Sequence, residues 1–245
     1  MPRRSPRAAD AGARTRKKER GTADGAAKTE DRRRRGGKSM RRDPEVRLSE
    51  ITEMDRALWS QGVSFAGIDE AGRGPLCGPV AAACVVMPPE PLILYVDDSK
   101  KLSEKRRETL YEEILRTAVY AKVSLSSAEE IDRLNILQAT KKAMADAARE
   151  APCSLFLVDA VASLDVPGEV RGIIHGDALC YSIAAASILA KVTRDRLLRE
   201  LDIQYPEYGF VRNKGYGTKE HIEALKKYGP CPAHRRSFIG HFVEV

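Results

Sequence analysis

The sequence lacks the features that mark membrane-spanning, secreted and zinc-ribbon proteins. No stretch of its 245 residues approaches the roughly 20 apolar residues that a membrane span requires. No apolar h-region follows the N-terminal charges, so a secretory signal is not expected. The five cysteines are an odd number without a CxxC pair, which argues against a disulfide framework or a four-cysteine zinc site. A reducing, cytoplasmic location fits these absences best.

Positive charge is concentrated near the N-terminus. Residues 1–42 contain 16 Lys and Arg against 5 Asp and Glu, whereas the remaining residues hold 26 basic and 30 acidic groups. The basic segment has no apolar periodicity, so it cannot bury enough surface to offset the entropy lost on ordering. We therefore predict a disordered basic tail over residues 1–45. Such a tail attracts phosphate backbones without sequence preference, but a solubilising extension or an early start codon explains it equally well.

The pattern after the tail indicates one α/β domain over residues 46–245 rather than two domains. Short apolar and β-branched runs predict strands, and longer amphipathic segments predict helices. The expected strands cover residues 63–70, 78–88, 119–126, 154–160 and 170–178, and the expected helices cover residues 46–62, 97–118, 127–150, 179–201 and 218–228. This order favours a mixed five-stranded sheet flanked by helices, with a helical C-terminal part.

Three of the expected strands end on acidic residues. The run FAGIDEAGRGPLCGP places Asp69 and Glu70 at the end of the first strand, and Asp159 and Asp177 close two later strands. Strand ends of an α/β sheet are neighbours, so we predict that these carboxylates converge. Because side chains alternate along a strand, Glu70 can join Asp69 only where the chain is already turning. A single aspartate at a strand end is more often a turn former or helix cap, but three strand ends together favour a site.

A cluster of four carboxylates needs protons or cations. Two unit charges about 4 Å apart repel by about 4 kcal/mol at an effective dielectric of about 20. Oxygen ligands without His or Cys suit Mg²⁺ or Mn²⁺ rather than zinc. Two such ions can activate a water and stabilise the leaving oxygen of a phosphodiester, so we expect a two-ion site. The sequence CPAH at 231–234 could form half of a zinc site, but no second half is evident.

The loop Gly72-Arg73-Gly74 follows the first acidic pair directly. Glycines let a main chain approach a ligand closely, and arginine pairs with phosphate. Main-chain groups at that distance could sense a ribose 2′-hydroxyl, the group that separates RNA from DNA. The loop is not a P-loop, because no GxxxxGK[ST] motif occurs. We predict that it contacts a nucleic-acid strand whose phosphate reaches the carboxylates.

These residues stand in a sequence that resembles prokaryotic ribonuclease HII. The similarity includes GIDEAGRGPLCGPVAAA, DSKKLSEKRRE, LNILQAT, SIAAASILAKVTRD, YGFVRNKGYGT and HRRSF, and it covers residues 64–239 nearly throughout. It implies the ribonuclease H fold and metal-dependent endonucleolytic cleavage of RNA in RNA–DNA hybrids. It also implies nicking 5′ to a single ribonucleotide embedded in duplex DNA, which leaves 5′-phosphate and 3′-hydroxyl ends.

The resemblance assigns the expected metal ligands to particular residues. The four acidic ligands of the family match Asp69, Glu70, Asp159 and Asp177. Two positions differ from the usual family sequence: Ala160 stands where glycine is more common, and His175 stands where a lysine often precedes Gly-Asp. His175 could modulate the site near neutral pH or be a neutral substitution. Neither difference removes a ligand.

The resemblance also implies substrate contacts. Gly72-Arg73-Gly74 matches the element that reads the 2′-hydroxyl of the ribonucleotide. Tyr216 matches the tyrosine that stacks under the following sugar and rejects a 2′-hydroxyl there. Lys100 and Lys191 are candidates for a phosphate contact. Covalent catalysis is not expected, because Ser187 and the cysteines have no evident base partner.

Two rival interpretations predict different behaviour. A non-catalytic nucleic-acid binder built on the basic tail would lose its function on deletion of residues 1–42 and would tolerate Asp69→Asn. A different nuclease on the same fold, such as a junction resolvase, would ignore ribonucleotides. For the enzyme we expect a monomer that acts on RNA–DNA hybrids and ribonucleotide-containing duplex DNA. A sliding-clamp contact would use a short terminal peptide, and the ending GHFVEV shows no clear version of one.

Overall fold

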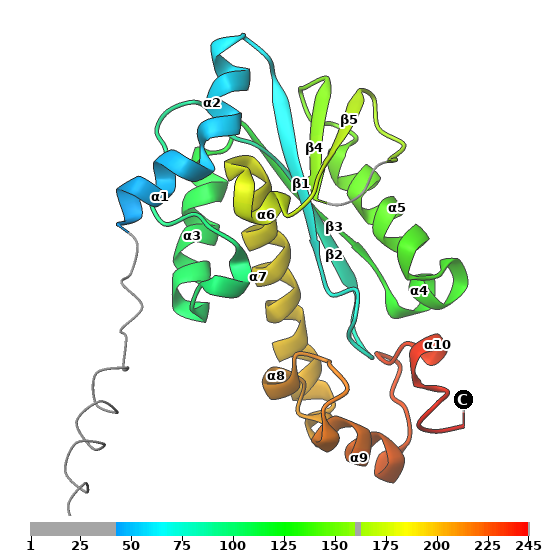
Figure 1. Ribbon diagram of the computed structural model, residues 1–245. Helices are drawn as coiled ribbons and strands as arrows, with labels where there is room; N and C mark the ends of the chain where they lie inside the picture. Colours follow the sequence, from blue (N-terminus) through cyan, green and yellow to red (C-terminus); the bar gives the residue numbers. More distant parts are fainter. Residues whose placement is uncertain (1–42, 160–162, 245) are drawn as a thin grey trace, which may run out of the picture. The chain divides into compact units, whose positions relative to one another are not determined.

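The computed structural model describes residues 43–159 and 163–244 (Figure 1). One five-stranded sheet has the strand order β3-β2-β1-β4-β5. The strands are β1 (Phe65–Ala71), β2 (Val80–Val86), β3 (Tyr120–Ser126), β4 (Leu155–Asp159) and β5 (Glu169–Ile173). Strands β1, β2 and β3 pair antiparallel, whereas β1, β4 and β5 pair parallel. The predicted mixed five-stranded sheet is confirmed.

The pairing of the central strand β1 determines where the acidic residues meet. Ile68 pairs with Val158 of the parallel strand β4. Asp69 and Asp159, the next residue of each strand, therefore lie at the same end of the sheet. The residues before them are buried in both strands, as expected for strands that are covered on both faces.

Helices cover both faces of the sheet (Figure 1). They are α1 (Pro44–Ile51), α2 (Glu53–Ser60), α3 (Glu104–Thr117), α4 (Ala128–Leu134), α5 (Ile136–Ala148), α6 (Gly176–Leu179), α7 (Tyr181–Gln204), α8 (Phe210–Asn213), α9 (Lys219–Tyr228) and α10 (Arg236–Ile239), with the 3-10 turns η1 (Ser99–Lys101) and η2 (Pro206–Tyr208). Helix α7 packs against β1 and β2, with α3 beside it. Helix α5 packs against β2 and β3 and contributes to a separate apolar cluster.

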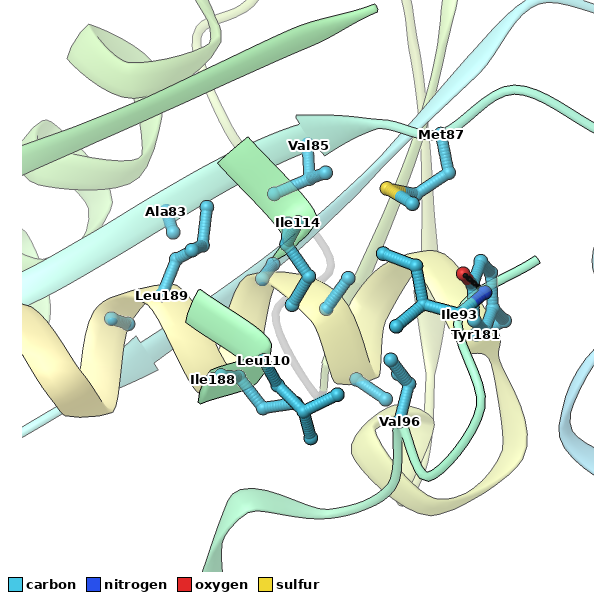
Figure 2. Packing of buried hydrophobic residues seen from close by; sticks show 14 of the residues in the cluster. Ala83, Val85, Met87, Ile93, Val96, Leu110, Ile114, Tyr181, Ile188 and Leu189 are labelled. Atoms are coloured by element: carbon cyan, nitrogen blue, oxygen red, sulfur yellow. Dashed lines mark hydrogen bonds between the residues drawn. The ribbon is translucent and has the colours of Figure 1, made fainter. Parts of the chain in front are cut away.

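The core between α7, α3 and the sheet consists mainly of aliphatic side chains (Figure 2). Val85 of β2, Leu110 and Ile114 of α3, and Ile188 and Leu189 of α7 are all buried there. Full burial of such a side chain contributes about 1.5–3 kcal/mol. This packing fixes α7 against the strands that carry the acidic residues.

Helix α7 approaches β1 closely at Gly67. A Cβ atom at Gly67 would overlap main-chain atoms of Ser182 and Ile183. The buried start of the helix obtains its hydrogen-bond partners from α2, because the Asp55 carboxylate accepts from the main-chain N–H groups of Tyr181 and Ser182, each at 3.0 Å. The first turn of α7 is therefore fixed on both sides.

The C-terminal part has an apolar cluster of its own, which includes the loop after β1. Tyr208, Phe210 and Leu225 are buried together with Leu76 and Cys77 of that loop. The loop is also paired to the C-terminal part by main-chain hydrogen bonds, from Leu76 N to Gly215 O and from Gly78 N to Ala233 O, each at 2.8 Å. The predicted helical C-terminal part thus supports the loop that follows the first acidic pair.

The strand expected to end at residue 178 is shorter than predicted. Strand β5 ends at Ile173, and Asp177 lies in the short helix α6. His175 before it has a left-handed backbone with φ 57°. A Cβ atom at Gly176 would overlap the Ile183 side chain, so the chain turns tightly against α7 here. The placement of Asp177 at a strand end was wrong, but the helix α6 still brings it beside the sheet.

Three segments expected to be continuous helices are interrupted. The segment 46–62 divides into α1 and α2 at Thr52, and the segment 127–150 divides into α4 and α5 at Asn135. The segment 97–118 divides into the 3-10 turn η1 and the helix α3. Asn135 has φ 66°, and its side chain accepts from Gln138 N to cap α5. The predicted capping box at Ser127 is confirmed at the start of α4.

Most of the predicted basic tail, residues 1–42, lies outside the described residues, as does Ala160. Helix α1 begins at Pro44, inside the range predicted as tail, and Asp43 caps it by accepting from Glu45 N at 3.0 Å. No helix within 43–159 and 163–244 is long and apolar enough to cross a bilayer. All five cysteines are free thiols, and Cys77 and Cys180 are buried.

Candidate active site

Three of the four predicted carboxylates come together at one end of the sheet. Asp69 ends the buried part of β1, Asp159 ends β4, and Asp177 lies in α6. Each offers a carboxylate oxygen within 4.8 Å of the other two. Within residues 43–159 and 163–244, this trio is the one acidic, His or Cys group close enough to share a metal ion.

Glu70 lies beside this trio rather than within it. Strand β1 continues to Ala71, which pairs with Ala81, so the chain has not yet turned at Glu70, contrary to the expected geometry. Glu70 Oε1 accepts from Arg73 Nη1 at 3.4 Å. Its other oxygen, Oε2, is buried without a hydrogen-bond partner. A buried carboxylate oxygen left in this state is costly unless a cation or a proton reaches it.

The environment of the carboxylates disfavours their negative charge. Burial, and then the charge of Glu70, raises the pKa of Asp69 well above its usual range, although a hydrogen bond from Ser187 partly offsets this. Burial also raises the pKa of Glu70, against the effect of Arg73. The pKa of Asp159 is raised mainly by burial, even though its Oδ1 accepts from Gly176 N at 3.0 Å. A bound cation would therefore strongly stabilise the ionised carboxylates of this cluster.

The residues present fit a hard divalent cation. The trio supplies only oxygen donors, and Glu70 Oε2 is an unsatisfied buried oxygen beside it. All-oxygen sites suit Mg²⁺ or Mn²⁺, whereas zinc sites generally include imidazole or thiolate. The chemistry of the donor set is thus that of a magnesium or manganese site.

The two lysines considered as phosphate contacts pair with different acidic residues. Lys100, from η1, donates to Asp177 Oδ2 at 3.1 Å, so it lies directly at the cluster. Lys191, from α7, donates to the buried Asp195 at 2.7 Å instead. Of the two lysine candidates, Lys100 is brought to the carboxylates, and Lys191 is paired elsewhere.

The loop Gly72-Arg73-Gly74 and Tyr216 lie side by side. A Cβ atom at Gly74 would come within 3.6 Å of Tyr216 Cε1. Arg73 and Gly74 are exposed, and the Tyr216 side chain is 49% exposed. An aromatic ring and a glycine loop next to acidic residues can together contact a sugar and its neighbouring phosphate.

Several residues that support the site were not predicted from the sequence. Ser187, considered only as a nucleophile, hydrogen-bonds to Asp69 and to the Ser99 hydroxyl at 2.9 Å. Two buried arginines, Arg194 and Arg235, donate to carbonyl oxygens of the loop after β1. Burial of such long basic side chains is rare, but nothing local in the sequence distinguishes them from exposed arginines.

A buried chain of hydrogen bonds ends at the carbonyl of Tyr216. Cys231 N donates to His234 Nδ1 at 3.1 Å, so the proton of His234 lies on Nε2, which is 3.1 Å from His221 Nε2. His221 then donates from Nδ1 to Tyr216 O at 2.9 Å. This order of donors requires both imidazoles to be neutral. The Cys231–His234 segment, considered as half of a zinc site, therefore supports the main chain at Tyr216.

The buried His234 predicts a loss of stability in acid. Burial, and then the nearby His221, lowers the pKa of His234 from 6.5 to about 4. Between these two values the unfolded chain binds a proton that the folded chain does not, so the free energy of unfolding decreases as the pH falls, by at most about 3 kcal/mol. Denaturant titrations of the wild type and His234→Gln should show a difference that shrinks from pH 6.5 to 4.

Replacement of the exposed His241 by glutamine is the matched control for this experiment. It should leave the pH dependence of unfolding unchanged. A difference between the wild type and His234→Gln that stays constant over this pH range would contradict the assignment of neutral, buried imidazoles.

Comparison with known proteins identifies the family. Residues 66–241 match the family model described as Ribonuclease HII. The chain belongs to the ribonuclease HII family. Ribonuclease HII of Caldanaerobacter subterraneus subsp. tengcongensis is 52% identical over 196 residues, which cover 79% of this chain and 81% of that protein. Ribonuclease HII of Geobacillus kaustophilus is 50% identical over 204 residues, covering 82% and 78%.

Solved structures of ribonucleases H2 and HII share the fold. The ribonuclease H2 of Pyrococcus horikoshii OT3 is similar with a TM-score of 0.60 and 29% identity, covering 71% of this chain and 93% of that one. The ribonuclease HII of Archaeoglobus fulgidus, solved in complex with PCNA, gives 0.62 and 28%, covering 72% and 94%. Family membership makes this chain an endoribonuclease that degrades RNA in RNA–DNA hybrids.

Proposed function

We propose that this ribonuclease HII also nicks duplex DNA 5′ to single embedded ribonucleotides, with Mg²⁺ or Mn²⁺ as cofactor, and leaves 5′-phosphate and 3′-hydroxyl ends. The observation that carries this proposal is that Tyr216 lies next to Gly74, which belongs to the loop that directly follows Asp69 and Glu70. Main-chain groups of Gly72-Arg73-Gly74 can contact the ribose 2′-hydroxyl of one nucleotide. The Tyr216 ring can stack under the next sugar and leave no room for a second 2′-hydroxyl.

Each carboxylate has a role in this proposal. Asp69, Asp159 and Asp177 would hold two divalent ions, and Glu70 would add its unsatisfied Oε2 to the donor set. When bound, such ions lower the pKa of an attacking water and stabilise a leaving 3′-oxygen. The protein itself orients the ribonucleotide through the glycine loop and excludes other sugars through Tyr216. No side chain has to act as a nucleophile.

The proposal is tested with a labelled DNA duplex that carries one ribonucleotide, in Mg²⁺ or Mn²⁺, beside an all-DNA duplex. We expect a single nick 5′ to the ribonucleotide, lost in EDTA, and no cleavage of the DNA control. Cleavage of long hybrids without cleavage at a single ribonucleotide would contradict the roles of Gly72-Arg73-Gly74 and Tyr216. Cleavage that ignores the 2′-hydroxyl would favour a junction-resolvase type of activity on the same fold.

We propose that Lys100 weakens metal binding at Asp177 and also contacts a phosphate of the duplex. Its ammonium group competes with a cation for Asp177. In Lys100→Met the Mg²⁺ concentration that gives half-maximal activity should fall by up to about fivefold, because exposed ion pairs are worth about 0–1 kcal/mol. The KM for duplex should rise if the lysine also contacts a phosphate. Metal titrations of the initial rate measure both effects.

Lys101→Met is the matched control for Lys100→Met. Lys101 pairs with Asp97 and Asp98, at 3.8 and 3.9 Å, and not with Asp177. Its replacement should leave the metal dependence unchanged. An equal shift in both variants would indicate a general charge effect and contradict a specific role of Lys100.

Four further aspects stay hypotheses for this chain. We expect it to act as a monomer and to work in the cytoplasm. The Archaeoglobus fulgidus relative was solved with PCNA, but the ending GHFVEV here shows no clear clamp-binding peptide. Lys191 is a candidate phosphate contact only if its ion pair with Asp195 opens on substrate binding.

A further inference from the structure

Two of the largest buried side chains in the described part of the chain are arginines. Arg194 of α7 is 1% exposed, and Arg235, directly before α10, is 0% exposed. Their guanidinium groups donate hydrogen bonds to main-chain carbonyl oxygens rather than to carboxylates. Burial of a charge without a paired counter-charge is expensive, so these residues are poorly explained as packing alone.

Arg235 holds the loop that follows β1 from within. Its Nη2 donates to Gly72 O at 2.6 Å, and its Nη1 donates to Arg73 O at 2.9 Å and to Pro75 O at 2.8 Å. Its Nε donates to Gly78 O at 3.0 Å. A single planar group thus fixes four carbonyls over seven residues, which only a guanidinium can do because of its five donors in one plane.

Arg194 holds the same loop from the side of α7. It donates to Cys77 O, Pro79 O and Lys214 O, each at 3.0 Å. Its side chain lies against Gly72, where a Cβ atom would overlap it. Lys214 is two residues before Tyr216, so Arg194 connects the glycine loop with the segment that carries the tyrosine.

The hydrogen bonds of Arg235 also limit how the loop can recognise a ribose. The carbonyls of Gly72 and Arg73 already accept from Arg235. These two carbonyls are oriented toward Arg235, so the main-chain N–H groups of the loop are the better placed of its groups to contact a 2′-hydroxyl. An N–H group recognises the hydroxyl oxygen, and the recognition depends on the position of the loop to within a fraction of an ångström.

We propose that Arg235 and Arg194 are positioning residues for ribonucleotide recognition: they fix the segment 72–79, and the Lys214–Tyr216 segment beside it, in the geometry that reads the 2′-hydroxyl. This inference rests on the proposed function, since it assigns the support of the loop that reads the sugar. Neither arginine touches the substrate in this role. They affect the rate of cleavage within the bound complex and not the affinity for the duplex.

The test uses the full chain with Arg235→Lys and Arg235→Met. Lysine keeps the charge but cannot bridge four carbonyls, and methionine keeps only the volume. Single-turnover cleavage of a duplex with one ribonucleotide should slow by about 30- to 100-fold in the methionine variant, with the lysine variant in between, because small misplacements of a reacting group have effects of this size. The Kd for the duplex should stay within about twofold, because Arg235 does not touch the duplex and its loss removes an effect made in the transition state rather than in binding.

A second substrate separates positioning from a general structural role. The ribonucleotide is replaced by a 2′-fluoro nucleotide, which accepts a hydrogen bond only weakly. The wild type should cleave the ribonucleotide much faster, and this preference should fall by about tenfold in Arg235→Met, because the misplaced loop no longer senses the hydroxyl. A preference equal to that of the wild type would overturn the proposal, whatever the change in rate or melting temperature.

Arg236→Met is the matched control, because Arg236 is the exposed neighbour of Arg235 and its main-chain N–H bond to Asp132 does not need its side chain. It should leave the preference unchanged. If Arg235 variants do not fold, Arg194→Lys is measured in the same way, and failure of both sets to fold would contradict a role confined to the loop. A wild type that does not nick at a single ribonucleotide would refute the proposed function instead.

Discussion

Asp69→Asn is expected to reduce cleavage of ribonucleotide-containing duplex by about 10³-fold or more. The carboxylate lies within 4.8 Å of those of Asp159 and Asp177, where it would hold divalent ions. Loss of a ligand removes several kilocalories per mole of transition-state stabilisation, and each 1.36 kcal/mol is about tenfold in rate. Single-turnover rates over a range of Mg²⁺ and Mn²⁺ concentrations measure the loss and show whether extra metal restores activity.

The same substitution should stabilise the metal-free protein. Burial and the charge of Glu70 raise the pKa of Asp69, so its ionised form destabilises the folded state at neutral pH, and a neutral amide relieves that cost. The melting temperature in EDTA should therefore rise. The further increase that Mg²⁺ or Mn²⁺ gives the wild type by binding the folded state should be lost.

Asp146→Asn provides the control for both measurements. Asp146 lies on α5 and pairs with Lys142 and Arg149, each at 2.8 Å, away from the acidic trio. Its replacement should leave cleavage and the metal-induced stabilisation unchanged. Activity close to that of the wild type in Asp69→Asn, or a retained metal-induced shift, would refute the metal-ligand role and give new weight to the basic tail.

Gly67→Ala is expected to destabilise the protein by about 3 kcal/mol or more. The added methyl group would overlap main-chain atoms of Ser182 and Ile183, which cannot move as a flexible side chain does. Overpacking typically costs about 1–3 kcal/mol, and more where main chain must shift. Because α7 carries Ser187, the hydrogen-bond partner of Asp69, displacement of the helix should also lower activity. Equilibrium unfolding in urea gives the free energy.

Gly229→Ala is the control for Gly67→Ala, because it introduces backbone strain without a steric overlap with a neighbouring element. Gly229 has φ +76°, and nothing lies within 4 Å of an added Cβ. It should cost about 1–3 kcal/mol, because φ +76° with ψ −178° is a backbone conformation that is essentially restricted to glycine. If Gly67→Ala cost no more than Gly229→Ala, α7 would have room to move away from β1, and the rigid support of the site would be in doubt.

The convergence of the acidic residues could be predicted from the sequence because it depends on local patterns. Apolar runs that end on Asp69 and Asp159 predict strand ends, and parallel strands bring such ends together. Asp177 was assigned to a strand for the same reason, but a left-handed residue at His175 and close packing of Gly176 on Ile183 place it in a helix. That turn depends on a contact with α7, which no local pattern encodes.

The residues that support the glycine loop could not be predicted from the sequence, for a different reason. Arg235 and Gly72 are 163 positions apart in the chain, and nothing in HRRSF separates the buried arginine from its exposed neighbour. The roles of Ser187 and of the two histidines are equally nonlocal, because each depends on which elements pack together. Sequence patterns thus predict the acidic residues and the glycine loop better than the buried groups that hold them in place.

The long separation between Gly72 and Arg235 has a consequence for the biosynthesis of the enzyme. During translation, the acidic residues of β1, β4 and α6 leave the ribosome well before the arginine that fixes the loop. A chain interrupted between α7 and α10 would carry all four carboxylates and lack the fixed loop. The acidic residues are thus complete in the growing chain before the loop that is proposed to read the 2′-hydroxyl can be fixed.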